Sequence, residues 1–242
     1  LFSKQLTHYE ITLSIMKNVK SGKDQIVEMV VSDIEVSPIW EDYYPVKLIT
    51  NRGDIECRYY QVTDAKWGAI WVGGAGGGWD TPARGLYPRL CQELIGEGIT
   101  SLRLRYRDSR VLQEAILDVL AGISYLETEG INAIALIGHS FGGAVVIQAA
   151  ACVSTVRTVV ALATQSYGAA IASQLPPQCS LLLLHGLCDR ILSPSCSEYV
   201  YQIAHQPKHL ILYPDTDHGL DEVAEEVYQV VRDWVIEKIT SS

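Results

Sequence analysis

The sequence lacks any apolar run long enough to cross a bilayer. No stretch approaches the about eighteen uninterrupted apolar residues that a membrane-spanning helix requires. Residues 1–20 also lack the apolar core of a secretory signal peptide. We therefore expect a soluble protein, although the chain begins at Leu1 and any targeting residues ahead of it lie outside this sequence.

Positive charge is also scarce, since 19 Lys and Arg residues face 28 Asp and Glu residues, for a formal net charge of −9. A surface that binds nucleic acid or an anionic membrane needs clustered Lys and Arg. The densest basic stretch, residues 103–107, favours a strand whose arginines lie at its ends or edge over a binding patch. We expect no nucleic-acid partner.

The six cysteines do not include a C-x-x-C pair. Cys152 lies in an apolar helical segment, where a thiol behaves as a small hydrophobic group. Cys188 and Cys196 are close in sequence, but spacing alone does not establish a disulfide. The simpler expectation is the reducing cytoplasm. No His, Cys, Asp or Glu cluster has convincing metal-site spacing, so we expect no metal and no other cofactor.

Short apolar runs alternate with helical patterns from residue 67 onward, which is typical of βαβ units and a parallel sheet. The runs are residues 68–72, 100–106, 133–137, 158–163, 180–185 and 209–213. The clearest helical patterns are residues 111–130, with inward positions Leu112, Ile116, Val119, Ile123 and Leu126, and residues 221–239, with inward positions Val223, Val227, Val230, Trp234 and Ile239. A length of 242 residues suits one α/β domain, residues 1–242.

Ahead of this alternation, residues 46–50 and 56–62 are joined by Asn-Arg-Gly-Asp and predict an antiparallel hairpin. Residues 1–35 are interpreted as an N-terminal extension or an edge strand. Residues 26–37 partly alternate, as an edge strand would, but a helix over residues 6–17 stays open as an alternative.

The pentapeptide Gly138-His139-Ser140-Phe141-Gly142 lies between a predicted strand and a predicted helix. That setting is typical of a nucleophile elbow, a sharp turn whose serine adopts a strained backbone. Residues two before and two after the serine must lack bulk, and both are glycine here. We predict Ser140 as a nucleophile, in preference to an ordinary Gly-Ser turn.

A serine nucleophile needs a general base and an acid that orients it. His218 follows the last predicted strand and is the predicted base, while His8, His205 and His209 are not in loops at strand C-terminal ends. His139 is expected to point away from the nucleophile, because adjacent elbow residues diverge. His185 ends a strand and is interpreted as a structural or supporting residue.

Asp189 follows the preceding strand and is the predicted acid. Asp217 is the main competitor, but a loop neighbour is usually badly placed to hold the His218 ring from behind. His185, Cys188 and Asp189 are therefore better explained by a triad than by a metal site. The order Ser140, Asp189, His218 is that of the α/β-hydrolase triad.

The glycine-rich loop Gly73–Gly78 follows another strand and predicts a second oxyanion donor beside the Phe141 N–H. Ala75 and Gly76 are both well positioned, and Ala75 is our assignment. The loop matches neither G-x-G-x-x-G nor G-K-[ST], so nucleotide binding is disfavoured.

The motifs "GHSFGG", "HGLCDRILSP" and "DTDHGL" resemble those of α/β-hydrolases, most closely the small lidless dienelactone-hydrolase-like esterases, over residues 46–239. The resemblance implies a three-layer α/β sandwich with a mostly parallel eight-stranded sheet and an antiparallel second strand. It also implies Ser140, Asp189 and His218 as the triad and Phe141 with Ala75 as oxyanion donors. Dienelactone hydrolases carry cysteine at the elbow, so their substrate is not supported here.

Many such proteins insert a helical cap where this chain has only residues 164–178, so we expect no large cap domain and an open site. Loops with Trp79, Gly76 and Tyr167 would then contact the substrate, although Trp79 equally suits a packing role.

These features predict a serine hydrolase that cleaves a small carboxylic ester or thioester through an acyl-enzyme. The same triad would serve an acyltransferase, an amidase or a peptidase, and the fold alone would suit a non-catalytic binding protein. The expected partner is a small-molecule acyl substrate. A homo-oligomer is left open.

Overall fold

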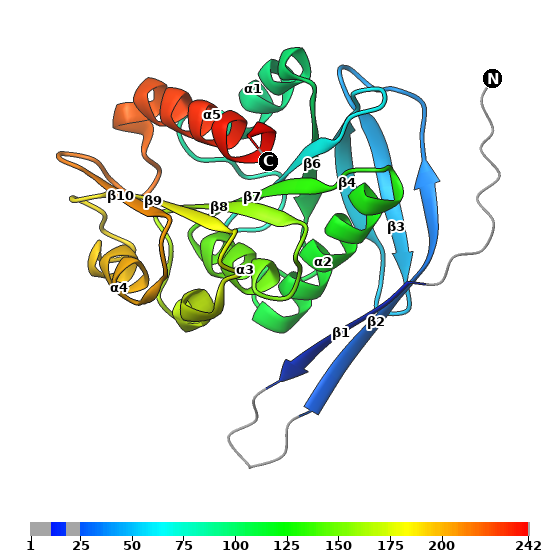
Figure 1. Ribbon diagram of the computed structural model, residues 1–242, viewed down its shortest axis with the longest axis horizontal. Helices are drawn as coiled ribbons and strands as arrows, with labels where there is room; N and C mark the ends of the chain where they lie inside the picture. The colour runs from blue at the N-terminus through cyan, green and yellow to red at the C-terminus, as the bar shows by residue number, and fades with distance from the viewer. Residues whose placement is uncertain (1–10, 18–24, 242) are drawn as a thin grey trace.

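The computed structural model describes residues 11–17 and 25–241, which contain one ten-stranded sheet (Figure 1). Its strand order is β1-β2-β3-β4-β6-β5-β7-β8-β9-β10. The strands are β1 (Ile11–Lys17), β2 (Gln25–Val36), β3 (Tyr44–Thr50), β4 (Ile55–Tyr60), β5 (Trp67–Val72), β6 (Ile99–Arg105), β7 (Ala133–His139), β8 (Val156–Leu162), β9 (Ser180–Gly186) and β10 (Lys208–Tyr213). Strands β5 to β10 are parallel, and β1 to β4 pair antiparallel.

The eight predicted strands are β3 to β10. The predicted hairpin is β3 and β4, and β4 is the antiparallel second strand of this set because it also pairs antiparallel with β6. The parallel strands are apolar because helices cover both of their faces, and every residue of β7 and β9 is buried. The predicted fold class is therefore confirmed, and two further strands extend the sheet.

The additional strands come from the N-terminal segment. The helix alternative is wrong for residues 11–17, which form β1, whereas residues 6–10 lie outside the described residues. Strand β2 is not the edge of the sheet, since β1 pairs along it from Ile11↔Val31 to Lys17↔Gln25. A stretch of seven residues is too short for apolar spacing to separate a helix from a strand, so strand pairing decided the outcome.

Helices form a layer on each face of the sheet (Figure 1). One layer holds α1 (Leu86–Glu93) and α5 (Ala224–Thr240), and the other holds α2 (Leu112–Thr128), α3 (Phe141–Ala150) and α4 (Ser195–Ile203). Short 3-10 helices are η1 (Leu94–Glu97), η2 (Ala169–Gln174) and η3 (Asp221–Val223). The five predicted inward residues of α2 are all buried.

The predicted inward face of α5 needs correction. Val227 and Ile239 are fully buried as expected, and Val223, Val230 and Trp234 are partly buried and pack against the same core. The prediction missed Val231 and Val235, which are fully buried. A period of 3.6 residues from Val227 leads to 231 and 235, so the packed stripe lies one position further along the helix.

The parallel strands bring the loops after β5, β7, β8, β9 and β10 to one edge of the sheet, where α/β proteins bind their ligands. The connection from β8 to β9 contains only the short helix η2 as regular structure, and no large cap covers that edge. All six cysteines are free, so Cys188 and Cys196 do not form a disulfide. Within residues 11–17 and 25–241, no helix is both long and apolar enough to cross a membrane.

Candidate active site

Ser140 occupies the turn between β7 and α3 in a strained backbone conformation, with φ 57° and ψ −116°. Non-glycine residues rarely adopt a positive φ, and such strain often accompanies function. The Ser140 N–H donates to the carbonyl of Leu162 on β8 at 2.8 Å, which holds the turn against the neighbouring strand. The predicted strand–turn–helix setting is therefore present.

The glycines on either side have no room for a side chain. A Cβ atom at Gly138 would overlap the Gly142 backbone, and one at Gly142 would overlap the carbonyl oxygen of Gly73. The turn thus closes on itself and packs directly against the start of the glycine-rich loop after β5. This close approach explains why both positions two residues from Ser140 are glycine.

The Ser140 hydroxyl is not used to cap the helix that follows. Ser140 is the N-cap residue of α3, yet its side chain makes no capping hydrogen bond. Phe141 is the first residue of α3, so its N–H has no partner within the helix, and the helix N-terminus favours negative charge there. The position combines a half-buried hydroxyl with an adjacent free N–H group.

His218 and Asp189 lie within hydrogen-bonding distance, with His218 Nδ1 2.7 Å from Asp189 Oδ2. The other carboxylate oxygen, Oδ1, accepts the N–H groups of Ile191 and Leu192, each at 2.8 Å. Burial alone would raise the pKa of Asp189, but hydrogen bonds from Leu192, His218 and Ile191 outweigh it and lower that pKa. The carboxylate is therefore ionised and directed at the imidazole.

The competing acid, Asp217, is engaged elsewhere. Its carboxylate pairs with the Arg190 side chain, whose Nε lies 2.7 Å from Oδ2, and this contact lowers the pKa of Asp217 to about 2. Asp217 reaches His218 only through the backbone, by accepting the His218 N–H at 2.8 Å. Among the hydrogen bonds of the described residues, the His218 ring uses Asp189 and not Asp217.

The His139 side chain, predicted to point away from the nucleophile, packs against His218. Its ring lies 4.7 Å from the His218 ring, centroid to centroid, and its Nε2 is 3.0 Å from the His218 carbonyl oxygen. A carbonyl only accepts, so Nε2 carries the proton and donates. Burial lowers the pKa of His139 to about 4, which keeps the ring neutral near pH 7. The His139 ring therefore packs on the His218 ring and on its carbonyl oxygen.

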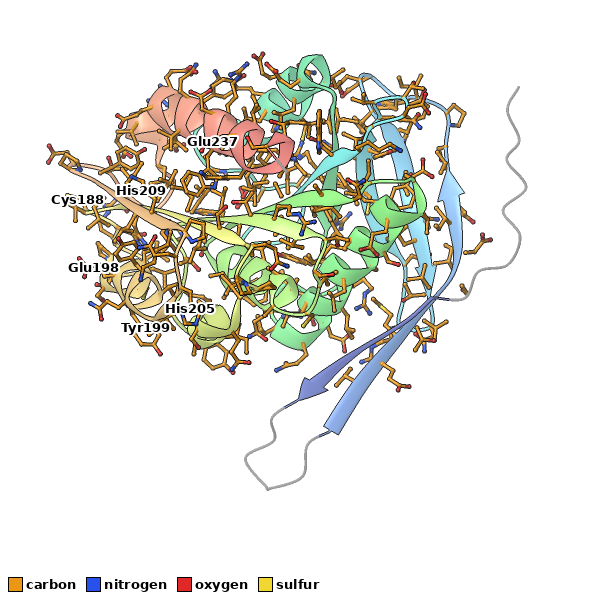
Figure 2. The ribbon with its side chains drawn as sticks, viewed as in Figure 1. Cys188, Glu198, Tyr199, His205, His209 and Glu237 are labelled. Carbon is orange, nitrogen blue, oxygen red and sulfur yellow. The ribbon has the colours of Figure 1, made fainter. Side chains whose placement is uncertain are left out.

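The other histidines fall as expected within the described residues. His209 lies near the start of β10, His205 follows α4, and both are exposed (Figure 2). Neither stands at the edge where Ser140, Asp189 and His218 lie.

The glycine-rich loop turns tightly beside the elbow. A Cβ atom at Gly74 would lie 3.4 Å from Ser140 Cβ, and the Gly77 N–H donates to the Gly74 carbonyl at 3.2 Å. Ala75 is exposed, and its carbonyl accepts the Ser109 hydroxyl at 2.8 Å. The loop therefore passes the elbow at Gly74, next to Ala75, whereas a Cβ atom at Gly76 would contact nothing within 4 Å.

The aromatic residues predicted at the substrate differ in their surroundings. The Trp79 ring stacks on the guanidinium of Arg58, which lies 4.3 Å from the ring centroid. The backbone carbonyl of Trp79 accepts a hydrogen bond from Arg103 Nη2 at 2.9 Å. Arg103 is buried in the sheet and not at a strand end or edge, which corrects the prediction for this residue. Tyr167, in the loop after β8, is 75% exposed.

The loops that carry Asp189 and His218 are in backbone contact. A Cβ atom at Gly186 would overlap the carbonyl of Thr216, and the Cys188 N–H donates to that carbonyl at 2.9 Å. Figure 2 shows Cys188, the residue before Asp189, at the same end of the molecule as α4, where Tyr199 is labelled. No group of three or more potential metal ligands occurs within the described ranges.

A cleft of about 430 Å³ opens beside the base. Its lining is His218, Gly219, Arg190, Ile191, Asp217, Asp221 and Glu222. His218 is thus part of the wall of an open cleft, and Ser140 is not among the residues that line it.

Known proteins share the fold of this chain but have little sequence similarity to it. No family model matches the chain. Among curated proteins, the uncharacterised protein YfhR of Escherichia coli (strain K12) is 37% identical over 62 residues, which are 26% of this chain and 22% of that protein. The match thus spans about a fifth of the length of this curated relative.

Solved structures match over most of their length. Est1E from Butyrivibrio proteoclasticus has a TM-score of 0.69 and 17% identity, over 81% of this chain and 99% of Est1E. Dienelactone hydrolase from Anabaena variabilis has a TM-score of 0.71 and 16% identity, over 81% of this chain and 98% of that protein. An alpha-beta serine hydrolase homologue from Coxiella burnetii has a TM-score of 0.66 and 15% identity, over 81% and 99%. The chain therefore has the α/β-hydrolase fold, with a mostly parallel sheet and no large cap domain.

Proposed function

We propose that this protein is a serine hydrolase that cleaves a small carboxylic ester or thioester through a covalent acyl-enzyme. The observation that carries the proposal is the ionised, buried Asp189 held 2.7 Å from His218 Nδ1, at the same sheet edge as Ser140 in its strained turn. Two proteins of similar fold, the esterase domain of a Rhodothermus marinus protein and dienelactone hydrolase from Anabaena variabilis, are by name an esterase and a hydrolase, which agrees with this chemistry.

In the first half of the reaction, His218 Nε2 takes the proton of the Ser140 hydroxyl as Oγ attacks the carbonyl carbon. Asp189 stabilises the imidazolium that forms. The negative charge on the carbonyl oxygen is stabilised by the N–H groups of Phe141 and Ala75. The C–O or C–S bond then breaks, and the leaving group takes the proton from His218.

In the second half, His218 removes a proton from water, and the resulting nucleophile attacks the acyl-enzyme. Collapse of the second tetrahedral intermediate releases the carboxylic acid and returns the proton to Ser140. The open edge beside Tyr167 and the cleft next to His218 support free access of water and of a small substrate. Six free cysteines agree with a reducing, cytoplasmic compartment.

The test uses p-nitrophenyl acetate and butyrate with the wild type and the Ser140→Ala variant. Loss of the nucleophile should lower kcat roughly 10⁴-fold or more, and a fluorophosphonate probe should label the wild type only. Ser173→Ala is the matched control, because it removes an exposed hydroxyl on η2 and should leave both readouts unchanged.

Equal turnover by the wild type and Ser140→Ala would contradict the assignment of the nucleophile. A folded wild type that neither turns over esters nor reacts with the probe would instead favour a non-catalytic binding protein. Formation of an amide or a new ester when an amine or alcohol is added would identify acyl transfer as the activity of the same site.

A further inference from the structure

A second histidine, His185, contacts the carboxylate that orients the base. His185 Nε2 lies 3.0 Å from Asp189 Oδ2, the same oxygen that accepts His218 Nδ1 at 2.7 Å. The side chains of His185 and Asp189 are both fully buried. One carboxylate oxygen is thus placed between two imidazole rings.

The partners of His185 fix its tautomer. Nε2 faces only acceptors, the carboxylate of Asp189 and the Leu192 carbonyl at 3.1 Å, so Nε2 carries the proton. Nδ1 lies 2.7 Å from the hydroxyl of Ser197 and accepts its proton. Burial lowers the pKa of His185, in agreement with a neutral ring.

His185 also fastens the turn that supports Asp189. The Leu192 carbonyl accepts from His185 while the Leu192 N–H donates to Asp189 Oδ1 at 2.8 Å. Ser197, the source of the hydroxyl, is fully buried on α4. The chain of contacts therefore runs from α4 through His185 and Asp189 to His218 and links a helix with the base.

We propose that His185 is a positioning residue that shares the negative charge of Asp189 Oδ2 with His218 and is itself oriented by Ser197. This inference rests on the proposed function only where kcat and KM are measured, because the titration of His218 does not depend on esterase activity. The polar Nε2–H of His185 donates to the Leu192 carbonyl and lies 3.0 Å from Oδ2, where its positive end attracts charge on that oxygen and holds the carboxylate in place. His185 thus sets both the direction and the strength of the Asp189–His218 interaction.

Other ionisable groups face this network and would stay unchanged when His185 is replaced. His139 packs on the His218 ring, Asp80 contributes charge near His139, and the Asp217–Arg190 pair flanks the same loop. A change that appears in His185→Phe and is reversed in His185→Gln can therefore be assigned to the loss of the Nε2 donor and not to these groups.

The experiment compares His185→Gln, which keeps an N–H donor at the ε position, with His185→Phe, which removes it. The titration of the His218 ring is followed by NMR on protein with labelled histidine, and its signal is assigned by its loss in His218→Gln. This readout does not require turnover. The steady-state constants kcat and KM with p-nitrophenyl acetate are measured alongside.

Removal of the donor should leave more charge on Oδ2 for His218, so the titration midpoint of that ring should rise by roughly half to one pH unit in His185→Phe. We expect kcat to fall roughly tenfold with KM unchanged. His185→Gln should return both quantities to near the wild-type values. Ser197→Ala, which releases Nδ1, should shift the midpoint in the same direction by a smaller amount.

A purely structural role would loosen the loop, weaken the Asp189 contact and lower the midpoint. A fall, or no change, in His185→Phe would therefore overturn the inference. If His185→Phe does not fold, Ser197→Ala decides in its place, because a fall or no change in its midpoint would likewise overturn the inference. A shifted midpoint in a protein without esterase activity would support the inference while rejecting the proposed function.

Discussion

Asp189 and Asp118 both have fully buried side chains, yet their surroundings shift their pKa values in opposite directions. Asp118, on α2, accepts the backbone N–H of Arg107 at 2.9 Å and pairs with its guanidinium. Burial raises the pKa of Asp118 to about 6 in spite of that cation. The pKa of Asp189 is lowered, although its ring partners are histidines.

The difference lies in the balance between burial and hydrogen-bond donors, because burial outweighs the donors at Asp118, whereas the donors outweigh burial at Asp189. Asp189 is surrounded by backbone N–H groups on one oxygen and two imidazoles on the other, whereas every donor to Asp118 comes from Arg107. Arg107 also contacts Glu114 at 3.0 Å and the Arg52 carbonyl at 2.9 Å. Asp118 thus holds together the β3–β4 turn, the end of β6 and the start of α2.

Among the variants that test this contrast, Asp189→Asn should have the largest effect, which is a loss of activity. An amide in place of the carboxylate favours the wrong tautomer of His218, so kcat/KM should fall roughly ten-thousandfold. The free energy of unfolding should change by only about 1 kcal/mol, because the amide oxygen can still accept the turn N–H groups. Ester turnover and urea unfolding measure the two quantities.

A fall of less than about tenfold in kcat/KM would show that Asp189 is not the orienting acid. Asp118→Asn is the matched control, since it makes the same change of atoms at an equally buried site.

Asp118→Asn should have a smaller effect, and this effect should be on stability instead of activity. The amide presents an NH₂ group to the buried donors of Arg107 in place of one acceptor oxygen, so the free energy of unfolding at pH 7 should fall by about 2 kcal/mol. The kcat/KM of the folded fraction should stay within about twofold of the wild type. Urea unfolding monitored by tryptophan fluorescence gives the stability, and a loss of activity without a loss of stability would contradict the contrast.

The pH dependence of that stability difference has a definite sign. The pKa of folded Asp118 is about 6, above its ordinary value of 3.8, so its proton linkage stabilises the fold at low pH and this contribution is lost as pH rises through about 6. The stability gap between the wild type and Asp118→Asn should therefore be larger at pH 4 than at pH 7. A gap that grows with pH would contradict the raised pKa.

The smallest effect is expected in Asp217→Asn. Asp217 pairs with the largely exposed Arg190 and does not contact the His218 ring, so kcat/KM should change by less than about threefold. A fall in kcat/KM as large as that in Asp189→Asn would show that Asp217, and not Asp189 alone, supports the base. Both variants are assayed with the same p-nitrophenyl ester.

Much of the fold could be predicted because its signals are local. Apolar runs of strand length, separated by helical patterns, predicted β5 to β10 within one or two residues at each end. The elbow was predictable from steric demand alone, since Gly138 and Gly142 have backbone where a side chain would lie. The nearness of Asp189 to His218 followed from the shared edge of parallel strands.

The remainder depends on contacts between segments far apart in the chain. Strand β1 is defined by its pairing with β2, and the burial of Arg103 depends on Trp79 folding over it. The contact between His139 and the His218 carbonyl could not be predicted from the residues next to His139, because His218 lies far away in the sequence. Only the position of His185 at a strand end, four residues before the acid, gave a signal for its role.

The overlap of Gly186 with the Thr216 carbonyl limits how this protein can change over evolution or by design. The segments that follow β9 and β10 touch backbone to backbone, so neither can accept an insertion or a larger residue there without moving the other. New substrate preferences are more readily acquired in the loops after β5 and β8, where Gly76 and Tyr167 have open space around them. Under the proposed function, the loops of Asp189 and His218 would then be inherited as one unit, while the loops that contact the substrate vary.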